Sequence, residues 1–236
     1  MAKKPQKRSE YKEAIYDEEH WILLGRLRQK AAHLMQTLAK SHLESTVHGS
    51  IARGDVNMKS DIDIFLPAKT SSFIVENALE KTDFSISRRF IIQATPTYAM
   101  KAHIEIDEKT TVSFPLMNMR KVEREFYKFG GEIGLEDLKH NRRVIGVDKR
   151  LMLIEPTSLG HKESTIVGQE DNVANMLGIS VETVSDRVRT LIRRDKIGRT
   201  GVFIKAEVGE TQSFEMVLKR LVNQNPAVRR RLLRSS

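Results

Sequence analysis

Two short segments of this chain constrain its fold and chemistry more than any other part of the sequence. Gly49 and Ser50 form a turn-like pair, and Asp61 and Asp63 follow about ten residues later inside an apolar run. In a β-strand, residues i and i+2 point to the same face, so the two carboxylates should stand side by side while the neighbouring isoleucines point the other way. Like charges this close repel each other, and a bound cation relieves the repulsion. Carboxylate oxygens suit Mg²⁺, which proteins often share with substrate phosphates. The two segments therefore predict a metal-dependent site for phosphoryl transfer.

The same segments resemble the signature of the nucleotidyltransferase superfamily that includes DNA polymerase beta, archaeal CCA-adding enzymes and small antibiotic nucleotidyltransferases. The shared pattern is an apolar residue, Gly-Ser, a spacer of about ten residues and Asp-x-Asp between apolar residues, and here it extends to Ala52-Arg53-Gly54 and to Ser60. The resemblance, which is to the archaeal type, implies Mg²⁺-dependent transfer of a nucleoside monophosphate from a nucleoside triphosphate, with release of pyrophosphate. From the residues alone, the alternative is a strand-end aspartate pair that caps neighbouring helices, with Gly-Ser as an ordinary turn.

The resemblance also implies a role for each residue around the turn. Gly49 and Ser50 would cradle the triphosphate, because glycine allows close backbone approach and hydroxyl and N–H groups bind phosphate oxygens. Arg53 would add a charge-assisted contact to phosphate. The alternative for Arg53 is a surface arginine on the helix after the turn. Ser60 would contact phosphate or cap the turn. These four residues form the predicted nucleotide-binding set.

Asp61 and Asp63 are the predicted catalytic and metal-binding acids, and relatives of this fold add a third acid so that two metal ions are held. In the family that acid lies on the second strand of a hairpin, where this chain has none. With a three-residue hairpin loop, apolar residues face apolar residues and Glu105 lies opposite Ser113. We therefore expect Glu105 to be the third catalytic acid and metal ligand, with Asp107 as the alternative metal ligand. If neither reaches the metal, the site would bind nucleotide without transferring it.

The periodicity of apolar residues predicts an α+β fold with two domains. A basic arm at 1–10, expected to be disordered, precedes a mixed-sheet nucleotidyltransferase domain at 11–155 and a small winged-helix domain at 156–236. The boundary is set at Pro156 and Gly160, within a stretch of small polar residues. Helices are expected over 17–40, 71–81, 119–129 and 135–140, and strands over 61–66, 90–94, 98–107, 111–116, 144–147 and 151–154.

A second pattern, at 170–194, is typical of a helix-turn-helix. Gly178 makes the turn, Ser180 caps a second helix predicted over 181–193, and 195–204 is expected to form a β-wing. In such modules the second helix reads the major groove of DNA through its first residues. The predicted nucleic-acid contacts are Thr183, Ser185, Arg187, Arg189, Arg193, Arg194, Lys196 and Arg199. The alternative is a winged helix that binds protein or forms a homodimer.

Composition sets the remaining limits. The 236 residues carry a formal net charge of +9, which favours a polyanionic partner such as DNA or RNA. The chain has no cysteine, which excludes disulfides and zinc–cysteine sites, and its apolar runs are too short to span a bilayer. We therefore expect a cytoplasmic protein with a nucleoside triphosphate as substrate and no membrane partner. One alternative is a DNA-binding regulator whose nucleotidyltransferase-like domain binds nucleotide without turnover. Another is an enzyme that modifies a protein or small molecule and dimerises through its winged helix.

Overall fold

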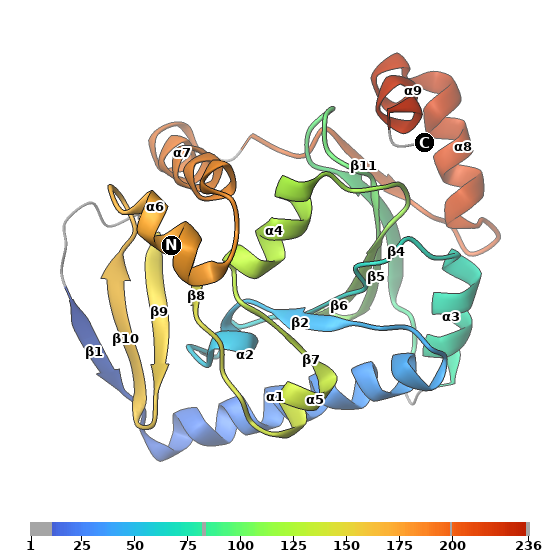
Figure 1. Ribbon diagram of the computed structural model, residues 1–236. Coiled ribbons are helices and arrows are strands. Elements are labelled where there is room, and N and C mark those ends of the chain that lie inside the picture. The colour runs from blue at the N-terminus through green and yellow to red at the C-terminus, as the bar shows by residue number, and fades with distance from the viewer. Residues whose placement is uncertain (1–10, 82–83, 199, 235–236) are drawn as a thin grey trace. The chain divides into compact units, whose positions relative to one another are not determined.

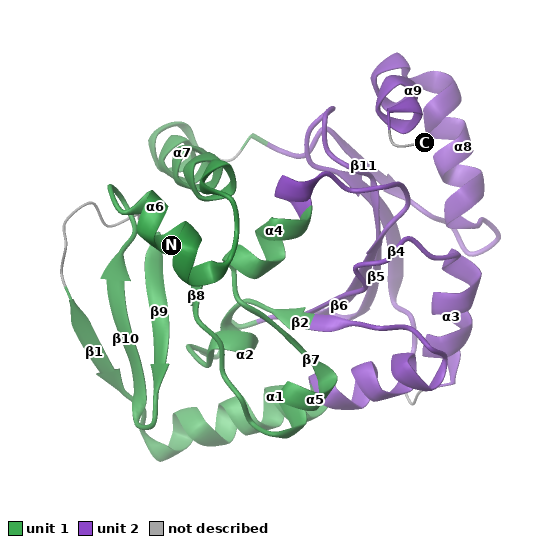
Figure 2. Ribbon diagram, in the orientation of Figure 1, with its two compact units in different colours: residues 1–30, 47–60, 124–200 green, residues 31–46, 61–123, 201–236 purple. Residues whose placement is uncertain are grey.

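The chain forms two compact units, which are coloured separately in Figure 2. Figure 1 shows the elements in chain order in a computed structural model, which describes residues 11–81, 84–198 and 200–234. Unit 1 comprises residues 1–30, 47–60 and 124–200, and unit 2 comprises residues 31–46, 61–123 and 201–236. Neither unit is continuous in sequence, and the boundary predicted at 155/156 falls inside a strand of unit 1. The predicted basic arm at 1–10 lies outside the described residues.

Unit 2 is built on a mixed sheet. Its strands are β3 (Ile62–Phe65), β4 (Arg88–Gln93), β5 (Lys101–Asp107), β6 (Thr110–Pro115) and β11 (Ile204–Glu207). They lie in the order β11-β4-β5-β6-β3. Only β3 and β6 are parallel among these neighbours, so the predicted mixed sheet is confirmed. The unit also contains α3 (Ser72–Glu80), α8 (Phe214–Gln224), α9 (Pro226–Leu233), the second half of α1 (Glu18–Lys40) and the start of α4 (Lys121–Phe129).

One face of this sheet is apolar, and the other, called the polar face below, carries polar side chains together with Phe65 and Phe90. In β5, Ala102 and Ile104 are fully buried, and Phe114 of the neighbouring β6 packs edge-on against Phe214 of α8, with 5.8 Å between ring centroids. The side chains that alternate with them in β5 before its bulge are half-buried and point to the other face: Lys101, His103 and Glu105. Since side chains alternate along a strand, the polar face is continuous across β5, β6 and β3.

Two charged side chains fix α8 and α9 to unit 2. Glu215, near the start of α8, accepts hydrogen bonds from the N–H (3.0 Å) and the hydroxyl (2.8 Å) of Ser72 at the start of α3. The buried Arg231 of α9 donates to the carbonyl oxygen of Thr97 (2.9 Å) and to the carboxylate of Glu123 (3.2 Å). The C-terminal helices therefore belong to the unit that contains the Asp-x-Asp strand.

Unit 1 contains an antiparallel sheet in the order β1-β10-β9-β8. These strands are β1 (Lys12–Ile15), β8 (Gly146–Val147), β9 (Met152–Thr157) and β10 (Gly160–Thr165). Pro156 and Gly160, where a domain boundary was expected, instead flank the turn of the β9–β10 hairpin. The unit also contains α2 (Ser50–Arg53), β7 (Glu132–Gly134), α5 (Leu135–Lys139), α6 (Glu170–Leu177) and α7 (Val181–Ile197), with residues 18–30 of α1, 47–48 of β2 (Thr46–His48) and 124–129 of α4.

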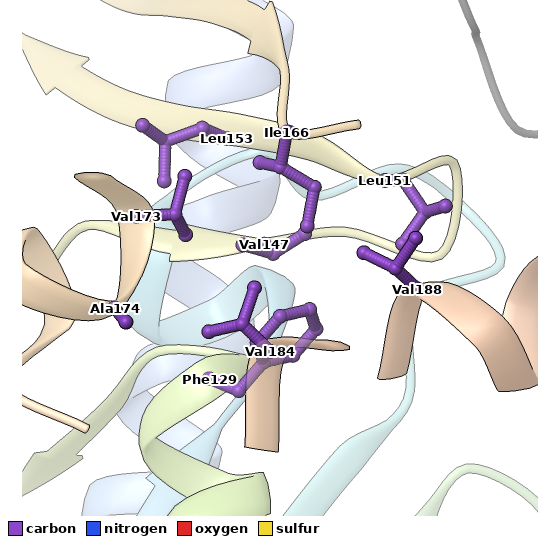
Figure 3. Close-up of a cluster of buried hydrophobic side chains, with 9 residues drawn as sticks. All are labelled: Phe129, Val147, Leu151, Leu153, Ile166, Val173, Ala174, Val184 and Val188. Atoms are coloured by element: carbon purple, nitrogen blue, oxygen red, sulfur yellow. The ribbon is translucent and has the colours of Figure 1, made fainter. Parts of the chain in front are cut away.

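The helices α6 and α7 pack on this sheet through a cluster of buried hydrophobic side chains (Figure 3). Val173 of α6 and Val184 and Val188 of α7 contribute from the helices. The other members are Phe129, Val147, Leu151, Leu153, Ile166 and Ala174. Gly178 joins the two helices with φ 61°, a left-handed conformation that glycine adopts without steric cost. The predicted pair of helices is therefore present, and it shares one core with β8 and β9.

The predicted β-wing at 195–204 is wrong. The helix α7 continues to Ile197, and β11 pairs antiparallel with β4 instead of with a second wing strand. A glycine-containing stretch before an apolar strand predicts a local hairpin, whereas the pairing with β4 joins segments about a hundred residues apart. Arg199, predicted at the tip of the wing, lies outside the described residues.

Candidate functional site

Gly49 begins the turn between β2 and α2. Its backbone has φ 80° and ψ −145°, a combination that glycine adopts and other residues avoid. Its N–H donates to the carbonyl oxygen of Gly131 (2.9 Å), which fixes the turn to the chain that follows α4. Apart from its two chain neighbours, no heavy atom of the described residues lies within 4 Å of the position that a Cβ would take at Gly49. The backbone conformation therefore requires glycine here, and the space beside the turn is open.

The hydroxyl of Ser50 is hydrogen-bonded to the hydroxyl of Ser60, the residue directly before Asp61. The Oγ atom of Ser50 donates to the Oγ atom of Ser60 (3.2 Å), which in turn accepts a hydrogen bond from the N–H of Asn57 (2.9 Å). Ser60 is buried, and its own N–H donates to the carbonyl oxygen of Asn57 (2.8 Å). Of the two roles predicted for Ser60, the structure shows the capping one. The two ends of the spacer in the motif are thereby held together.

Arg53 has partners other than the predicted phosphate. Its guanidinium is buried and forms a bidentate ion pair with Asp55, with Nε–Oδ1 and Nη2–Oδ2 distances of 2.9 Å. Its Nη1 donates to the carbonyl oxygens of Gly130 (2.5 Å) and Val147 (3.4 Å). These bonds engage four of the five N–H groups of the guanidinium. The predicted phosphate contact therefore has no support, and Arg53 instead ties α2 to later parts of unit 1.

In unit 2, the Asp-x-Asp segment shows the alternation that the sequence predicts. Ile62 and Ile64 are fully buried, whereas Asp61 is exposed directly before β3 and Asp63 is half-buried within it. Asp63 lies opposite Thr111 of β6. Asp63 therefore lies on the polar face of the sheet.

The predicted register of the β5–β6 hairpin is wrong. His103, rather than Glu105, lies opposite Ser113, and Glu105 lies opposite Thr111. The register differs from the prediction by two residues. One comes from the loop, which is Glu108-Lys109 because Asp107 lies opposite Thr110, and the other comes from a bulge between Glu105 and Asp107 that adds one residue to β5. The prediction assumed a three-residue loop and a regular ladder.

Both candidates for a third acid are engaged elsewhere. The carboxylate of Glu105 forms an ion pair with Arg88 of β4 (Nη2–Oε2 2.9 Å), on the side of β5 away from β3. The Oδ1 atom of Asp107 accepts a hydrogen bond from the N–H of Lys109 (2.9 Å) and so caps the hairpin turn. Neither observed contact directs a carboxylate toward the Asp-x-Asp strand.

The residues present fit one Mg²⁺ better than two. Mg²⁺ is usually held through one or two carboxylates together with substrate phosphates, which Asp61 and Asp63 suit. Thr111 lies between Asp63 and Glu105 in a row across three strands. Within residues 11–81, 84–198 and 200–234, no group of three or more His, Cys, Asp or Glu side chains is arranged to hold a metal ion. The prediction of a second ion, bound with a third acid, therefore has no support in this geometry.

Lys101 and His103 are two basic side chains of the polar face, and the sequence assigned no role to Lys101. The ammonium of Lys101 lies 5.8 Å from the ring centroid of Phe65 in β3. Burial lowers the pKa of Lys101 to about 8, and the charge of Glu123 partly opposes this. Burial, with the charges of Lys101 and Lys205, lowers the pKa of His103 to about 4, so its imidazole is neutral at pH 7. The one available signal was the alternation of polar residues along β5, which places a cation on the same face as the Asp-x-Asp strand.

Comparison with protein families identifies the segment that holds these acids. Residues 29–113 match the family model described as the nucleotidyltransferase domain. The match includes the Gly-Ser turn, the Asp-x-Asp strand and β6 as far as Ser113. No match was found among curated proteins, and none among solved structures.

The nucleotidyltransferase match ends before α6 and α7, where nucleic-acid contacts were predicted. Thr183 is buried, and its hydroxyl donates to the carboxylate of Glu125 (2.6 Å), so the predicted contact through Thr183 is wrong. Arg187 is half-buried, with its guanidinium 4.8 Å from the ring centroid of Phe126, and Ser185 is also half-buried. The predicted contacts that the structure leaves exposed are Arg189, Arg193, Arg194 and Lys196.

Proposed function

We propose that this chain transfers a nucleoside monophosphate from a nucleoside triphosphate to an acceptor and releases pyrophosphate. The nucleotidyltransferase domain at residues 29–113 points to nucleotidyl transfer in general. One observation supports the more specific proposal of nucleoside monophosphate transfer. Asp61 and Asp63 stand at the start of a strand whose isoleucines are buried, so the two carboxylates are presented away from the core.

In this proposal the residues of the chain bind and orient the nucleotide. The open turn at Gly49 and the hydroxyl of Ser50 bind oxygens of the triphosphate. Asp61 and Asp63 hold Mg²⁺, which when bound neutralises charge on the phosphates as a Lewis acid. Lys101 adds a positive charge to the face that carries Asp63.

The bond changes of the reaction are those of a phosphoryl substitution. The acceptor oxygen forms a bond to the α-phosphorus while the bond from that phosphorus to the bridging oxygen of pyrophosphate breaks. The proton of the acceptor hydroxyl passes to solvent, because Glu105 is held by Arg88 and is not available as a nearby base. A rate limited by this proton transfer would be modest, since a positioned base typically contributes about 10²–10⁴-fold.

A second candidate function is nucleotide binding without turnover, in a regulator. The ion pair between Glu105 and Arg88 favours it, as does the hydroxyl of Thr111 beside Asp63. Both functions share the Gly-Ser turn and the Asp-x-Asp strand. They differ in whether bound nucleoside triphosphate is cleaved.

We also propose a nucleic acid as the macromolecular partner. The formal net charge of +9 and the exposed arginines of α7 support this proposal. Dimerisation through α6 and α7 is the alternative use of these helices. A cytoplasmic location remains a prediction from the absence of cysteine. In the part of the chain that the structure describes, no helix has the length and apolar character needed to cross a membrane.

The test is incubation of the full chain with each α-³²P-labelled nucleoside triphosphate, Mg²⁺ and a cell extract, followed by separation of labelled products. Transfer predicts covalent label on an acceptor and equimolar pyrophosphate. Tight nucleotide binding with neither product would establish the second candidate instead. Absence of both binding and label would contradict both functions.

A further inference from the structure

The C-terminal half of α7 presents an exposed stripe of positive charge. Arg189, Arg193 and Lys196 follow one another at i, i+4 and i+7, so they lie on one side of the helix. All three are exposed, and Arg194 beside them is exposed as well. Among the residues that the structure describes, none of these four forms an ion pair with a carboxylate. The stripe therefore carries charge that the fold itself does not neutralise.

The N-terminal half of α7 packs against other elements of unit 1. Ser180 and Thr183 are bound to the carboxylate of Glu125, whose Oε2 atom accepts from the N–H of Ser180 (3.1 Å) and from the hydroxyl of Thr183 (2.6 Å). Val184 is fully buried in the cluster of Figure 3. The exposed Glu182 places a negative charge in the first turn. The first residues of this helix, which would read base edges in a helix-turn-helix, are therefore committed to packing or are acidic.

We propose that the C-terminal half of α7 binds the phosphate backbone of a nucleic-acid duplex and does not read its bases. This inference rests on the proposed nucleic-acid partner and specifies its surface and mode of contact. Phosphate contacts position a protein on a duplex, whereas base contacts give sequence specificity. The exposed cations lie in the C-terminal half of α7, away from the first residues that read base edges in a helix-turn-helix.

The chemistry of the stripe favours a duplex over a single strand. Single-strand binding generally uses aromatic side chains on which bases stack, and residues 181–197 contain none. The residues from Arg189 to Lys196 span about 10 Å along the helix axis. That length of duplex carries roughly six phosphates, so each cation has a phosphate within reach. Arginine guanidinium groups suit phosphate because their N–H groups bind it in a bidentate manner.

The experiment measures binding of the full chain to a 20-base-pair duplex across a salt series from 50 to 200 mM, with duplex DNA and duplex RNA as separate arms. The variant carries three changes: Arg189→Gln, Arg193→Gln and Lys196→Gln. Removing three phosphate contacts should reduce the slope of log affinity against log salt by about 2.7. The ratio of the affinity of the wild-type chain to that of the variant should therefore fall about 40-fold between 50 and 200 mM salt.

A matched control removes the same number of positive charges at positions outside α7. The control variant carries three changes at exposed positions outside α7: Arg26→Gln, Lys219→Gln and Arg220→Gln. It should lose far less of the salt slope, because its charges do not lie along one stripe. Far-ultraviolet circular dichroism establishes that both variants are folded, since every changed side chain is exposed.

Each outcome decides the matter. Loss of slope in the α7 variant alone, with equal affinity for duplexes of unrelated sequence, would establish the inference. Equal losses in the two variants would overturn it and leave nucleic acid as the partner, bound elsewhere or through net charge alone. Strong selection of one duplex sequence by the wild-type chain would overturn the claim that bases are not read. If the wild-type chain bound neither duplex, the nucleic-acid partner and this inference would both fall, while nucleotidyl transfer is tested separately by the labelled-nucleotide assay.

Discussion

Glu125 joins the start of α7 to α4, and its replacement should destabilise unit 1 strongly. Its Oε2 atom accepts from the Ser180 N–H at 3.1 Å, from the Ser180 hydroxyl at 2.5 Å and from the Thr183 hydroxyl at 2.6 Å. Hydrogen bonds to a charged group contribute about 1.5–3 kcal/mol each, and three donors that share one oxygen add less than their sum. Glu125→Ala leaves these donors without their acceptor, so unfolding should become easier by about 3–5 kcal/mol. Glu125→Gln keeps an oxygen acceptor without charge and should cost about 2 kcal/mol.

The assay is urea unfolding followed by the fluorescence of Trp21, the one tryptophan of the chain, which lies in unit 1. The control is Glu136→Ala, since Glu136 is exposed and pairs with Lys139 on the surface. It should change the unfolding free energy by less than about 0.5 kcal/mol. A loss below about 1 kcal/mol for Glu125→Ala would contradict this role of Glu125, because a hydrogen-bonded buried carboxylate contributes more than that.

Three further outcomes are expected. Gly49→Ala should cost about 1–3 kcal/mol through backbone strain, because φ is 80° and the space beside the turn is open among the described residues. Urea unfolding measures this cost. Glu105→Gln should lower the rate of nucleotidyl transfer less than about tenfold, a barrier change under about 1.4 kcal/mol, because Arg88 holds this carboxylate away from β3. A rate loss as large as that of Asp63→Asn in the same assay would contradict this expectation. Burial lowers the pKa of His161, so below the ordinary imidazole pKa of about 6.5 the unfolded chain takes up a proton that the folded chain does not. Stability should therefore fall as pH drops from about 6.5 toward the folded pKa, and His161→Gln should flatten that part of the profile; an unchanged profile would be inconsistent with a buried neutral imidazole.

The sequence predicted correctly the elements whose signal lies within a short stretch of residues. The alternation around Asp61 and Asp63, the amphipathic helix α1 and the α6–α7 pair all follow from spacing that a short window contains. The strand β10 was missed because Pro156 and Gly160 mark a hairpin turn with the same residues that mark a linker. Turn residues show where the chain changes direction, and they do not show whether it pairs with itself afterwards.

The errors at the candidate site come from irregular or distant contacts. The hairpin register depended on a two-residue loop and on a bulge between Glu105 and Asp107, and no residue type in that segment requires the bulge. Arg53 was assigned to phosphate although one acceptor, Asp55, lies two residues away; its other acceptors, Gly130 and Val147, lie 77 and 94 residues away in the chain. Long-range partners of this kind are set by the fold as a whole, so local sequence does not reveal them.

The most direct test concerns Asp61 and Asp63. The double variant Asp61→Asn/Asp63→Asn and the wild-type chain are compared for Mg²⁺-dependent pyrophosphate release from nucleoside triphosphates in the presence of cell extract. The control variant is Asp171→Asn/Asp195→Asn, which removes two exposed carboxylates outside the matched nucleotidyltransferase segment. We expect release by the wild-type chain and the control, and none by the double variant. Equal release by all three proteins would contradict a role for the Asp-x-Asp strand in nucleotidyl transfer.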